Sequence, residues 1–342
     1  MSSTLMVETR GDPLGTIRQI LKTIWRNAKL EQMLIPSNGS NEVNQVPRLL
    51  FSPDEIELFN PFKPLMTSNT ARFIPQLTQA EKAIRMGAVL RPCEMRALKG
   101  LERLHPMNTN SLLTISFDCL GTYPLEDFHW RTQRKGSAEQ LAQETIQFAK
   151  QGGIVPYRFR SACQVCHSPA SEDAHINIGV IGLPIRQVLL LTFREKVLEN
   201  LLTNNGLSID KADPKLINQH TLMIAKINER NHRVGDRIRQ GMAEVFPDTI
   251  DQFIDTFTEC GECQKCMQVC PICAVQMPIR SESGKYLLEE IVQWAESCAG
   301  CGMCDQVCPK HRPLSFFFSY VREQLIQESL SPTSSTKSTM IH

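Results

Sequence analysis

The chain has 342 residues, enough for two domains, and 42% of them are hydrophobic, enough for a packed core that needs no disulfides. Its 37 lysines and arginines against 36 aspartates and glutamates leave a formal charge of +1. This balance excludes the strongly basic surface typical of nucleic-acid-binding proteins, so no nucleic-acid partner is expected.

The expected location is the cytoplasm. The polar start, MSSTLMVETRGDPLG, has no apolar stretch of the kind found in signal peptides. The longest apolar run, 176–193, is interrupted by Pro184, Arg186 and Gln187, which predicts two short elements and a turn rather than a transmembrane segment. Clustered cysteines in the cytoplasm bind metal more often than they pair, and an odd number, 13, cannot form a complete set of disulfides.

The first 60 residues are expected to form an N-terminal helical and loop segment. Residues 16–30 have the spacing of an amphipathic helix, and the polar run PSNGSNEVNQVP predicts a loop. A mixed α/β domain is expected to follow over residues 61–205.

Two single cysteines of this domain lie at the ends of predicted strands. Cys93 stands at the junction of a buried strand at 86–90 and a helix that begins at Pro92, where the helix N-terminus favours a thiolate. Cys119 follows the apolar strand in SLLTISFDCLGTYP, and strand ends are where α/β sheets assemble their sites. Single cysteines in apolar strands are nevertheless usually core thiols.

A C-x2-C pair, Cys163 and Cys166, stands in a loop before a strand predicted at 176–181. One such pair also suits zinc or a redox dithiol. Together with the two single cysteines it makes four thiols, the number that a cubane iron–sulfur cluster needs, but spacing alone leaves a cluster here undecided.

Residues 206–257 are expected to form a helical connector. Its charged stretch, KINERNHRVGDRIRQ, is typical of a solvent-facing helix, although a partner could dock there.

The segment 258–330 carries a duplicated cysteine motif. The run ECGECQKCMQVCP reads C-x2-C-x2-C-x3-C-P, and CAGCGMCDQVCP repeats it 38 residues later. In two-cluster ferredoxins the fourth cysteine of each run binds the other cluster. This pattern predicts two 4Fe–4S clusters, the first bound by Cys260, Cys263, Cys266 and Cys308 and the second by Cys298, Cys301, Cys304 and Cys270.

Zinc is the alternative for this segment, which we call the dicluster ferredoxin-type domain. Zinc favours C-x2-C pairs that are separated by longer loops, so two runs of four cysteines, each followed by proline, suit it badly. Cys273 has no counterpart in the second run and is expected to be a buried thiol rather than a ligand. Residues 331–342 are expected to be a disordered tail.

Three stretches of the α/β domain resemble the beta-subunit family of coenzyme F-420-reducing hydrogenases and F-420-dependent formate dehydrogenases. They are GAVLRPCEMRALKGL, ISFDCLGT and CQVCHSPASEDAHINIGVIG, which together span roughly residues 60–200. The resemblance implies a domain that carries FAD, one 4Fe–4S cluster and a site for coenzyme F-420 as substrate. Carried over by position, it makes Cys93, Cys119, Cys163 and Cys166 the ligands of a third cluster.

The chain also departs from that family. Its ferredoxin-type unit follows the α/β domain instead of preceding it, and its end resembles the helical dicluster unit of heterodisulfide-reductase subunits. His175 replaces an acid of the family motif, and it is expected either near the flavin or simply in a loop. No G-x-G-x-x-G loop is present, so a Rossmann NAD site is unsupported. The scattered arginines, which could bind flavin phosphates but are more often on the surface, are Arg91, Arg96, Arg158 and Arg160.

The expected function is that of an iron–sulfur flavoprotein, an electron-transfer subunit of an anaerobic oxidoreductase complex. A flavin accepts a hydride and releases electrons singly, as iron–sulfur clusters require. Its partner is expected to be the catalytic subunit of a formate dehydrogenase, a hydrogenase or a heterodisulfide-reductase-like complex. The alternative is an iron–sulfur relay without hydride chemistry, and a zinc-dependent binding module is disfavoured by the cysteine spacing.

Overall fold

The computed structural model describes residues 2–39, 44–79, 84–153, 158–203, 206–241, 252, 255, 263–282 and 284–330. Cys260, the second part of the predicted connector and the predicted tail at 331–342 lie outside these residues. None of the described helices is both long enough and apolar enough to cross a bilayer.

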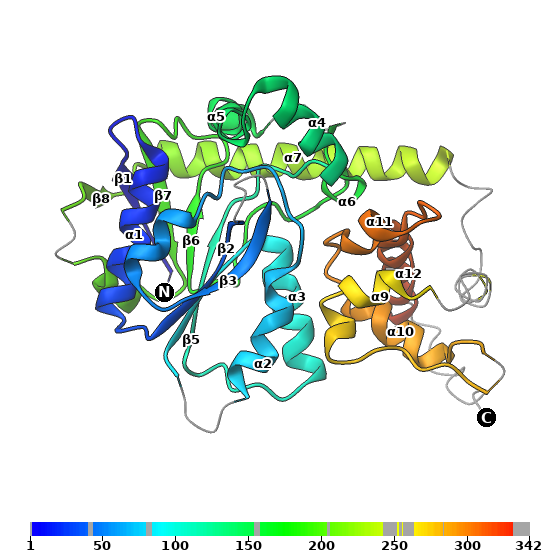
Figure 1. Ribbon diagram of the computed structural model, residues 1–342. Coiled ribbons are helices and arrows are strands. Elements are labelled where there is room, and N and C mark those ends of the chain that lie inside the picture. The colour runs from blue at the N-terminus through cyan, green and yellow to red at the C-terminus, as the bar shows by residue number, and fades with distance from the viewer. Residues whose placement is uncertain are drawn as a thin grey trace.

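Within the described residues, eight strands form one mixed sheet in the order β3-β2-β4-β5-β6-β7-β1-β8 (Figure 1). Neighbouring strands β2, β4, β5 and β6 are parallel, and the remaining neighbours are antiparallel. The strands are β1 (Ser3–Glu8), β2 (Gln32–Asn38), β3 (Gln45–Leu50), β4 (Met86–Leu90), β5 (Leu112–Phe117), β6 (Ile176–Gly179), β7 (Val188–Phe193) and β8 (Ile209–Lys211).

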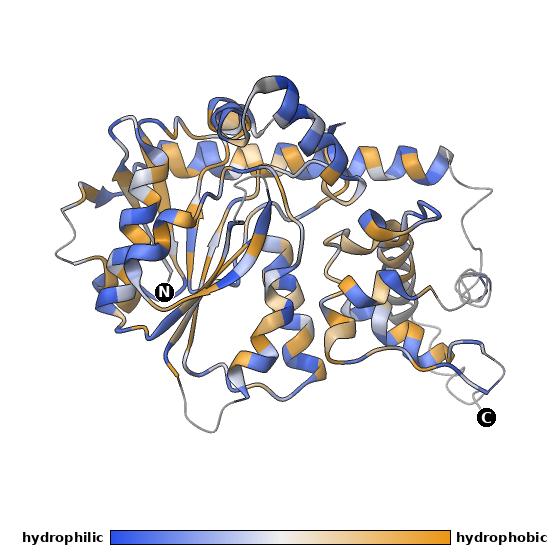
Figure 2. Ribbon diagram, in the orientation of Figure 1, coloured by the Kyte–Doolittle hydropathy of each residue, from blue (hydrophilic) through white to orange (hydrophobic). Residues whose placement is uncertain are grey.

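The central strands are covered on both faces, as their composition requires. Every residue of β4 and β6 is buried, and hydrophobic residues run along the middle of the sheet (Figure 2). The main core joins these strands to α1 (Pro13–Asn27) and to Ile227 of the long helix α7 (Pro214–Gly241). The other helices of the α/β domain are α2 (Ile74–Thr78), α3 (Pro92–Leu104), α4 (Leu125–Lys135), α5 (Ala138–Phe148) and α6 (Ser161–Gln164).

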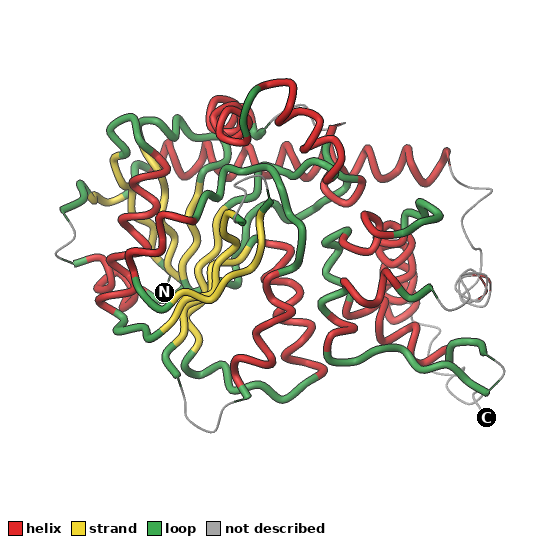
Figure 3. Tube along the Cα trace, in the orientation of Figure 1, coloured by secondary structure: helices red, strands yellow, loops and turns green. Residues whose placement is uncertain are grey.

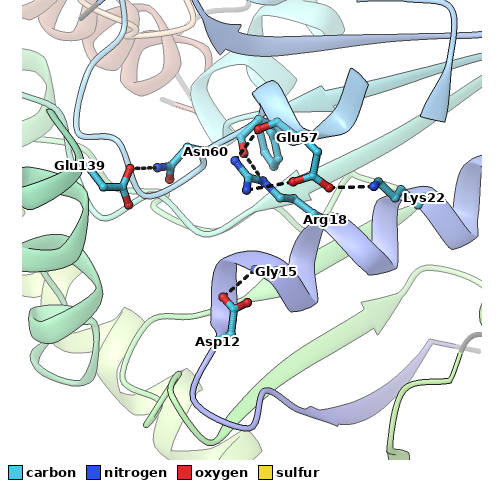
Figure 4. Close-up of polar contacts among 8 residues, drawn as sticks. Asp12, Gly15, Arg18, Lys22, Glu57, Asn60 and Glu139 are labelled. Atoms are coloured by element: carbon cyan, nitrogen blue, oxygen red, sulfur yellow. Dashed lines mark hydrogen bonds and ion pairs between the residues drawn. The ribbon is translucent and has the colours of Figure 1, made fainter. Parts of the chain in front are cut away.

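Polar contacts fix helix α1 against the 3-10 helix η1 (Pro53–Leu58) (Figure 4). Asp12 caps α1 by accepting a hydrogen bond from Gly15 N at 2.8 Å. Further along the helix, Arg18 and Lys22 approach the Glu57 carboxylate at 3.1 and 2.7 Å. The Glu57 side chain is 56% exposed, so these ion pairs orient the helix more than they stabilise it. Asn60 and Glu139 link the following loop to α5 in the same view.

The C-terminal unit, residues 263–330, consists of helices joined by loops (Figure 3). It contains α9 (Lys265–Val269), the 3-10 helix η6 (Ile272–Ala274), α10 (Leu288–Ser297), α11 (Met303–Val307) and α12 (Leu314–Leu330). The unit lies beside α3, whose Leu98 and Leu101 share a hydrophobic core with Ile272 and Trp294 of the unit (Figure 1). A Cβ atom on Gly100 would lie 2.9 Å from Ile272 Cδ1 and 3.0 Å from Ser297 O, so α3 approaches the unit closely.

The structure confirms several sequence predictions and corrects one. The mixed α/β class, the strand at 86–90, the helix that begins at Pro92 and the closing helix are present. Residues 1–60 contain the expected helix, α1, but they also supply three strands of the sheet that were not expected. The two ends of the polar run that predicted a loop belong to β2 and β3, where Pro36 and Pro47 face each other in register. Proline is tolerated there because β3 is an edge strand.

Candidate metal centres

A cavity at the carboxyl ends of the central strands, here called the sheet-edge cavity, gathers all four cysteines that were predicted to bind a third cluster. Cys93 and Cys119 stand just after the carboxyl ends of the parallel strands β4 and β5, where α/β folds place their sites. Cys163 belongs to α6 and Cys166 to the loop that follows. A fifth cysteine, Cys301 of the C-terminal unit, lines the same cavity.

The position of Cys93 follows from its place in the first turn of α3. Pro92 starts this helix, and the Glu94 carboxylate caps it by accepting hydrogen bonds from Arg91 N at 2.7 Å and Thr70 N at 2.8 Å. Glu94 is fully buried, so these bonds fix the start of the helix against the preceding loop. Burial raises the pKa of the Cys93 thiol well above its usual range.

Cys119 is held by its neighbour Asp118, whose side chain is fully buried. The Asp118 carboxylate accepts hydrogen bonds from Val180 N at 2.8 Å and Ile181 N at 3.1 Å, which join the ends of β5 and β6. It also lies 2.6 Å from His220 Nε2 on α7. Cys119 N itself donates to Pro169 O at 2.7 Å, so both sides of the cysteine are tied to the scaffold.

Two arginines direct positive charge at the C-x2-C pair. Arg160 Nη2 lies 3.7 Å from Cys163 Sγ, and Arg96 Nη2 lies 3.8 Å from Cys166 Sγ. Burial raises the pKa of Cys163, but Arg160 and Thr122 lower it more, so the net shift favours the thiolate. Cys119 shows the opposite balance, since burial and the neighbouring Cys163 raise its pKa to about 11.

A second cavity, here called the C-terminal cavity, is lined by Cys270, Cys298, Cys301 and Cys304. These are the four cysteines that the duplicated motif predicts around one cluster. Trp294 Nε1 donates a hydrogen bond to Cys270 Sγ at 3.3 Å. A hydrogen bond from Cys273 contributes most to lowering the pKa of Cys270, which falls to about 7 despite burial.

The other predicted set is only partly described. Cys266 belongs to α9 and Cys308 follows α11, and these two short helices pack against each other. Cys308 is buried, and Cys263 and Cys266 are partly exposed. Cys260 lies outside the described residues, so the arrangement of this set stays a prediction.

The linings of the two cavities suit iron–sulfur clusters. Neither lining contains an aspartate, a glutamate or a histidine, so a metal bound there would be held by cysteine sulfur. Among the described residues, no three metal-binding side chains are close enough to hold a single ion. A cubane has iron at four corners, and its thiolates therefore lie further apart than the ligands of one ion. None of the described cysteines forms a disulfide.

His175 does not reach either cavity. It precedes β6, whereas Cys119 follows the parallel strand β5, so the two residues lie towards opposite ends of the sheet. Its Nδ1 atom lies 3.1 Å from Thr114 N and 2.7 Å from Thr114 Oγ1. Burial lowers the pKa of His175. The expectation of a flavin contact at His175 stays a prediction.

Sequence reasoning missed the roles of several residues around these cavities. Arg91 and Arg160 are buried rather than solvated, although arginine usually stays on the surface. Asn231, from the middle of α7, donates a hydrogen bond to Cys166 O at 2.7 Å. For Arg160, its place three residues before Cys163 was a sequence signal that could have indicated a contact with that sulfur.

The fold resembles that of a known structure. It is similar to a chain in the xenon-derivatized F-420-reducing NiFe hydrogenase complex of Methanosarcina barkeri, with a TM-score of 0.50 and 12% sequence identity. The match covers 69% of this chain and 91% of that chain. No protein-family model matches the sequence. At this identity the likeness establishes a shared fold.

Proposed function

We propose that the chain is an iron–sulfur electron-transfer subunit of an oxidoreductase complex. The observation that carries the proposal is the wall shared by the two cysteine-lined cavities. Cys301 lines both cavities. The sheet-edge cavity has four other cysteines, and the C-terminal cavity has three that make a set of four with Cys301, which is the number that a cubane cluster needs. Two adjacent cluster sites are what a chain needs to pass electrons along its length.

Each cavity would hold one 4Fe–4S cluster, which accepts or releases one electron at a time. Cys93, Cys119, Cys163 and Cys166 are the proposed ligands in the sheet-edge cavity, and Cys270, Cys298, Cys301 and Cys304 those in the C-terminal cavity. A third cluster would use Cys260, Cys263, Cys266 and Cys308. Arg96 and Arg160 donate hydrogen bonds towards the sulfurs, and such contacts stabilise negatively charged sulfur.

The finer proposal concerns the electron donor and the partner. The sequence resemblance supports FAD bound in the α/β domain and a hydride exchanged with coenzyme F-420. The neighbour in fold comes from a complex that reduces coenzyme F-420, which agrees with that choice of substrate. The proposed partner is a catalytic subunit. The hydrogenase complex among known structures favours a hydrogenase, ahead of a formate dehydrogenase or a heterodisulfide-reductase-like complex.

A relay without hydride chemistry is the second candidate, and the arginines favour it. Arg91 donates to Gln45 Oε1 and Leu65 O, at 2.7 and 2.8 Å. Arg96 donates to Ala299 O at 3.0 Å and Arg160 to Thr122 Oγ1 at 2.7 Å. Because these guanidinium groups already donate hydrogen bonds to protein oxygens, fewer of their N–H groups are left to bind flavin phosphates.

Iron and sulfide analysis of anaerobically purified protein tests the electron-transfer proposal. Three clusters predict about twelve iron atoms per chain with equal sulfide. About eight would remove one cluster from the proposal. Stoichiometric zinc without sulfide would contradict it entirely.

Flavin extraction and anaerobic titration separate the two candidates. Bound FAD should bleach on addition of reduced coenzyme F-420, with NADH as the control reductant. Protein that carries its clusters but retains no flavin after reconstitution with FAD would favour the relay.

A further inference from the structure

The guanidinium of Arg160 is buried among sulfur atoms. Its side chain lies between the α/β domain and the C-terminal unit, and the residue is only 4% exposed. Nε donates to Thr122 Oγ1 at 2.7 Å. The terminal nitrogens lie 3.6 Å from Met303 Sδ, 3.4 Å from Met66 Sδ and 3.7 Å from Cys163 Sγ. Among the described residues, no aspartate or glutamate forms an ion pair with it.

A guanidinium stays protonated in proteins, and burying its charge without a counter-charge is costly. The acidic side chain in contact with Arg160 is the Cys163 thiol, a proposed cluster ligand. Arg160 lines the sheet-edge cavity, while Met303, which it contacts, lines the C-terminal cavity. Cys301 lines both cavities. The charge of Arg160 therefore lies at the wall that separates the two proposed cluster sites.

A second buried donor is directed at the same wall. Asn69 is fully buried, and its Oδ1 accepts a hydrogen bond from Ala71 N at 3.1 Å. Among the described residues its Nδ2 group has no hydrogen-bond partner, although it lies close to Cys301 of the C-terminal unit. This buried donor of the α/β domain would be available to a cluster held at the wall.

We propose that the positive charge of Arg160 raises the reduction potentials of the clusters on both sides of Cys301. The inference rests on the proposed function. Reduction of either cluster adds one electron and no proton, so the new negative charge stays beside the guanidinium and is stabilised by it. Because the same charge acts on both clusters, both become easier to reduce.

Potentiometric titration of the full chain, followed by electron paramagnetic resonance, tests the inference. Arg160→Met should lower the equilibrium constant for reduction of both clusters at least tenfold, which is 59 mV for one electron. Arg160→Lys, which keeps the charge, should restore most of the wild-type value. Loss of a signal in Cys163→Ser identifies the cluster of the sheet-edge cavity.

Arg131→Met is the matched control. The Arg131 side chain is 14% exposed, pairs with Asp127 at 2.9 Å and stacks on Tyr123, and it lines neither cysteine cavity. Its loss removes the same formal charge and should leave both potentials unchanged. If Arg160→Met does not fold, Arg160→Gln, which keeps a donor for Thr122, is tested against the same tenfold criterion.

Potentials that match wild type in the neutral variant would overturn the inference, as would an equal shift in Arg131→Met. Failure of the proposed function looks different, because wild-type protein would then contain no iron and sulfide.

Discussion

Cys163 and Cys273 are both thiols in short helical turns, yet their surroundings differ. Cys163 lines the sheet-edge cavity, with Arg160 and Thr122 beside its sulfur. Cys273 lies in η6, is 8% exposed, and packs in the hydrophobic core between α3 and the C-terminal unit. A hydrogen bond to Cys270 and burial raise the pKa of Cys273, so it remains a protonated donor. The two residues are therefore expected to differ in function.

Replacing each by serine tests this difference. Cys163→Ser should remove about four iron atoms per chain, because the cubane loses one thiolate ligand. Cys273→Ser should retain all iron, since serine can still donate to Cys270, and should cost about 1 kcal/mol in stability. Iron and sulfide assays check both outcomes. Equal iron loss from the two variants would contradict the ligand assignment.

Gly302 is the point where the cysteine loop of the C-terminal unit touches α6. Its φ of +67° lies in the left-handed region, and a Cβ atom there would overlap with Ala162 Cβ. Gly302→Ala should therefore cost about 1–3 kcal/mol for the backbone alone, and more for the overlap. Gly284→Ala is the control, because Gly284 has a φ of +81° but open space around it. Urea denaturation should show a clearly larger loss for Gly302→Ala, and Ala162→Gly should recover part of the difference.

At the scale of elements, Asp118 connects β5, β6 and α7. Its carboxylate receives two backbone donors from the end of β6, an amide donor from Asn177 at 3.1 Å, and His220 from α7. Helix α7 also contacts the loop after α6, where Asn231 donates a hydrogen bond to Cys166 O. The carboxylate thus couples the position of the long helix to the strand end that carries Cys119.

The His220 contact predicts a pH dependence of stability. Burial lowers the pKa of His220, but the hydrogen bond and charge of Asp118 raise it more, so the folded state binds the proton more tightly than the unfolded state. The stabilisation is complete below the ordinary histidine pKa of about 6.5 and is lost as pH rises through the raised folded value. His220→Gln should cost about 1–3 kcal/mol at low pH, with a difference that shrinks as pH increases. Denaturation at several pH values checks this, and a constant difference would contradict it.

On the scale of the whole molecule, the two parts are stabilised differently. The sheet has its own large hydrophobic core with α1 and α7. In the C-terminal unit, α9 and α11 have five residues each, too short to be stable alone. Its buried surface includes cysteines that the proposed function assigns to metal. Folding of this unit should therefore depend on its clusters, as in other small metal-binding domains.

Iron removal should reveal this difference. After anaerobic chelation, amide hydrogens in residues 263–330 should exchange faster, while β4, β5 and β6 should keep their protection. Hydrogen-exchange mass spectrometry of the full chain measures both regions at once, and a chelator-free sample is the control. Loss of protection across the whole sheet would show that the two parts unfold together.

The sequence alone determined the features that depend on local patterns. The strand and helix around Cys93 follow from a short apolar run and from Pro92 at the first helical position. The duplicated motif grouped Cys270, Cys298, Cys301 and Cys304, which do line one cavity. Within residues 1–60 the helix was predicted and the three strands were not, because prolines and polar residues at strand ends predict a loop unless the edge of a sheet accommodates them.

Only the tertiary structure decided which distant residues meet. The sheet brings Cys93, Cys119 and the C-x2-C pair to one edge, and docking of the C-terminal unit adds Cys301 to the same cavity. It also buries Arg160 between sulfur atoms and places His220 against Asp118, contacts that no periodicity records. The physical reason is that local patterns specify strands and helices, whereas the surroundings of a buried charge depend on how those elements pack.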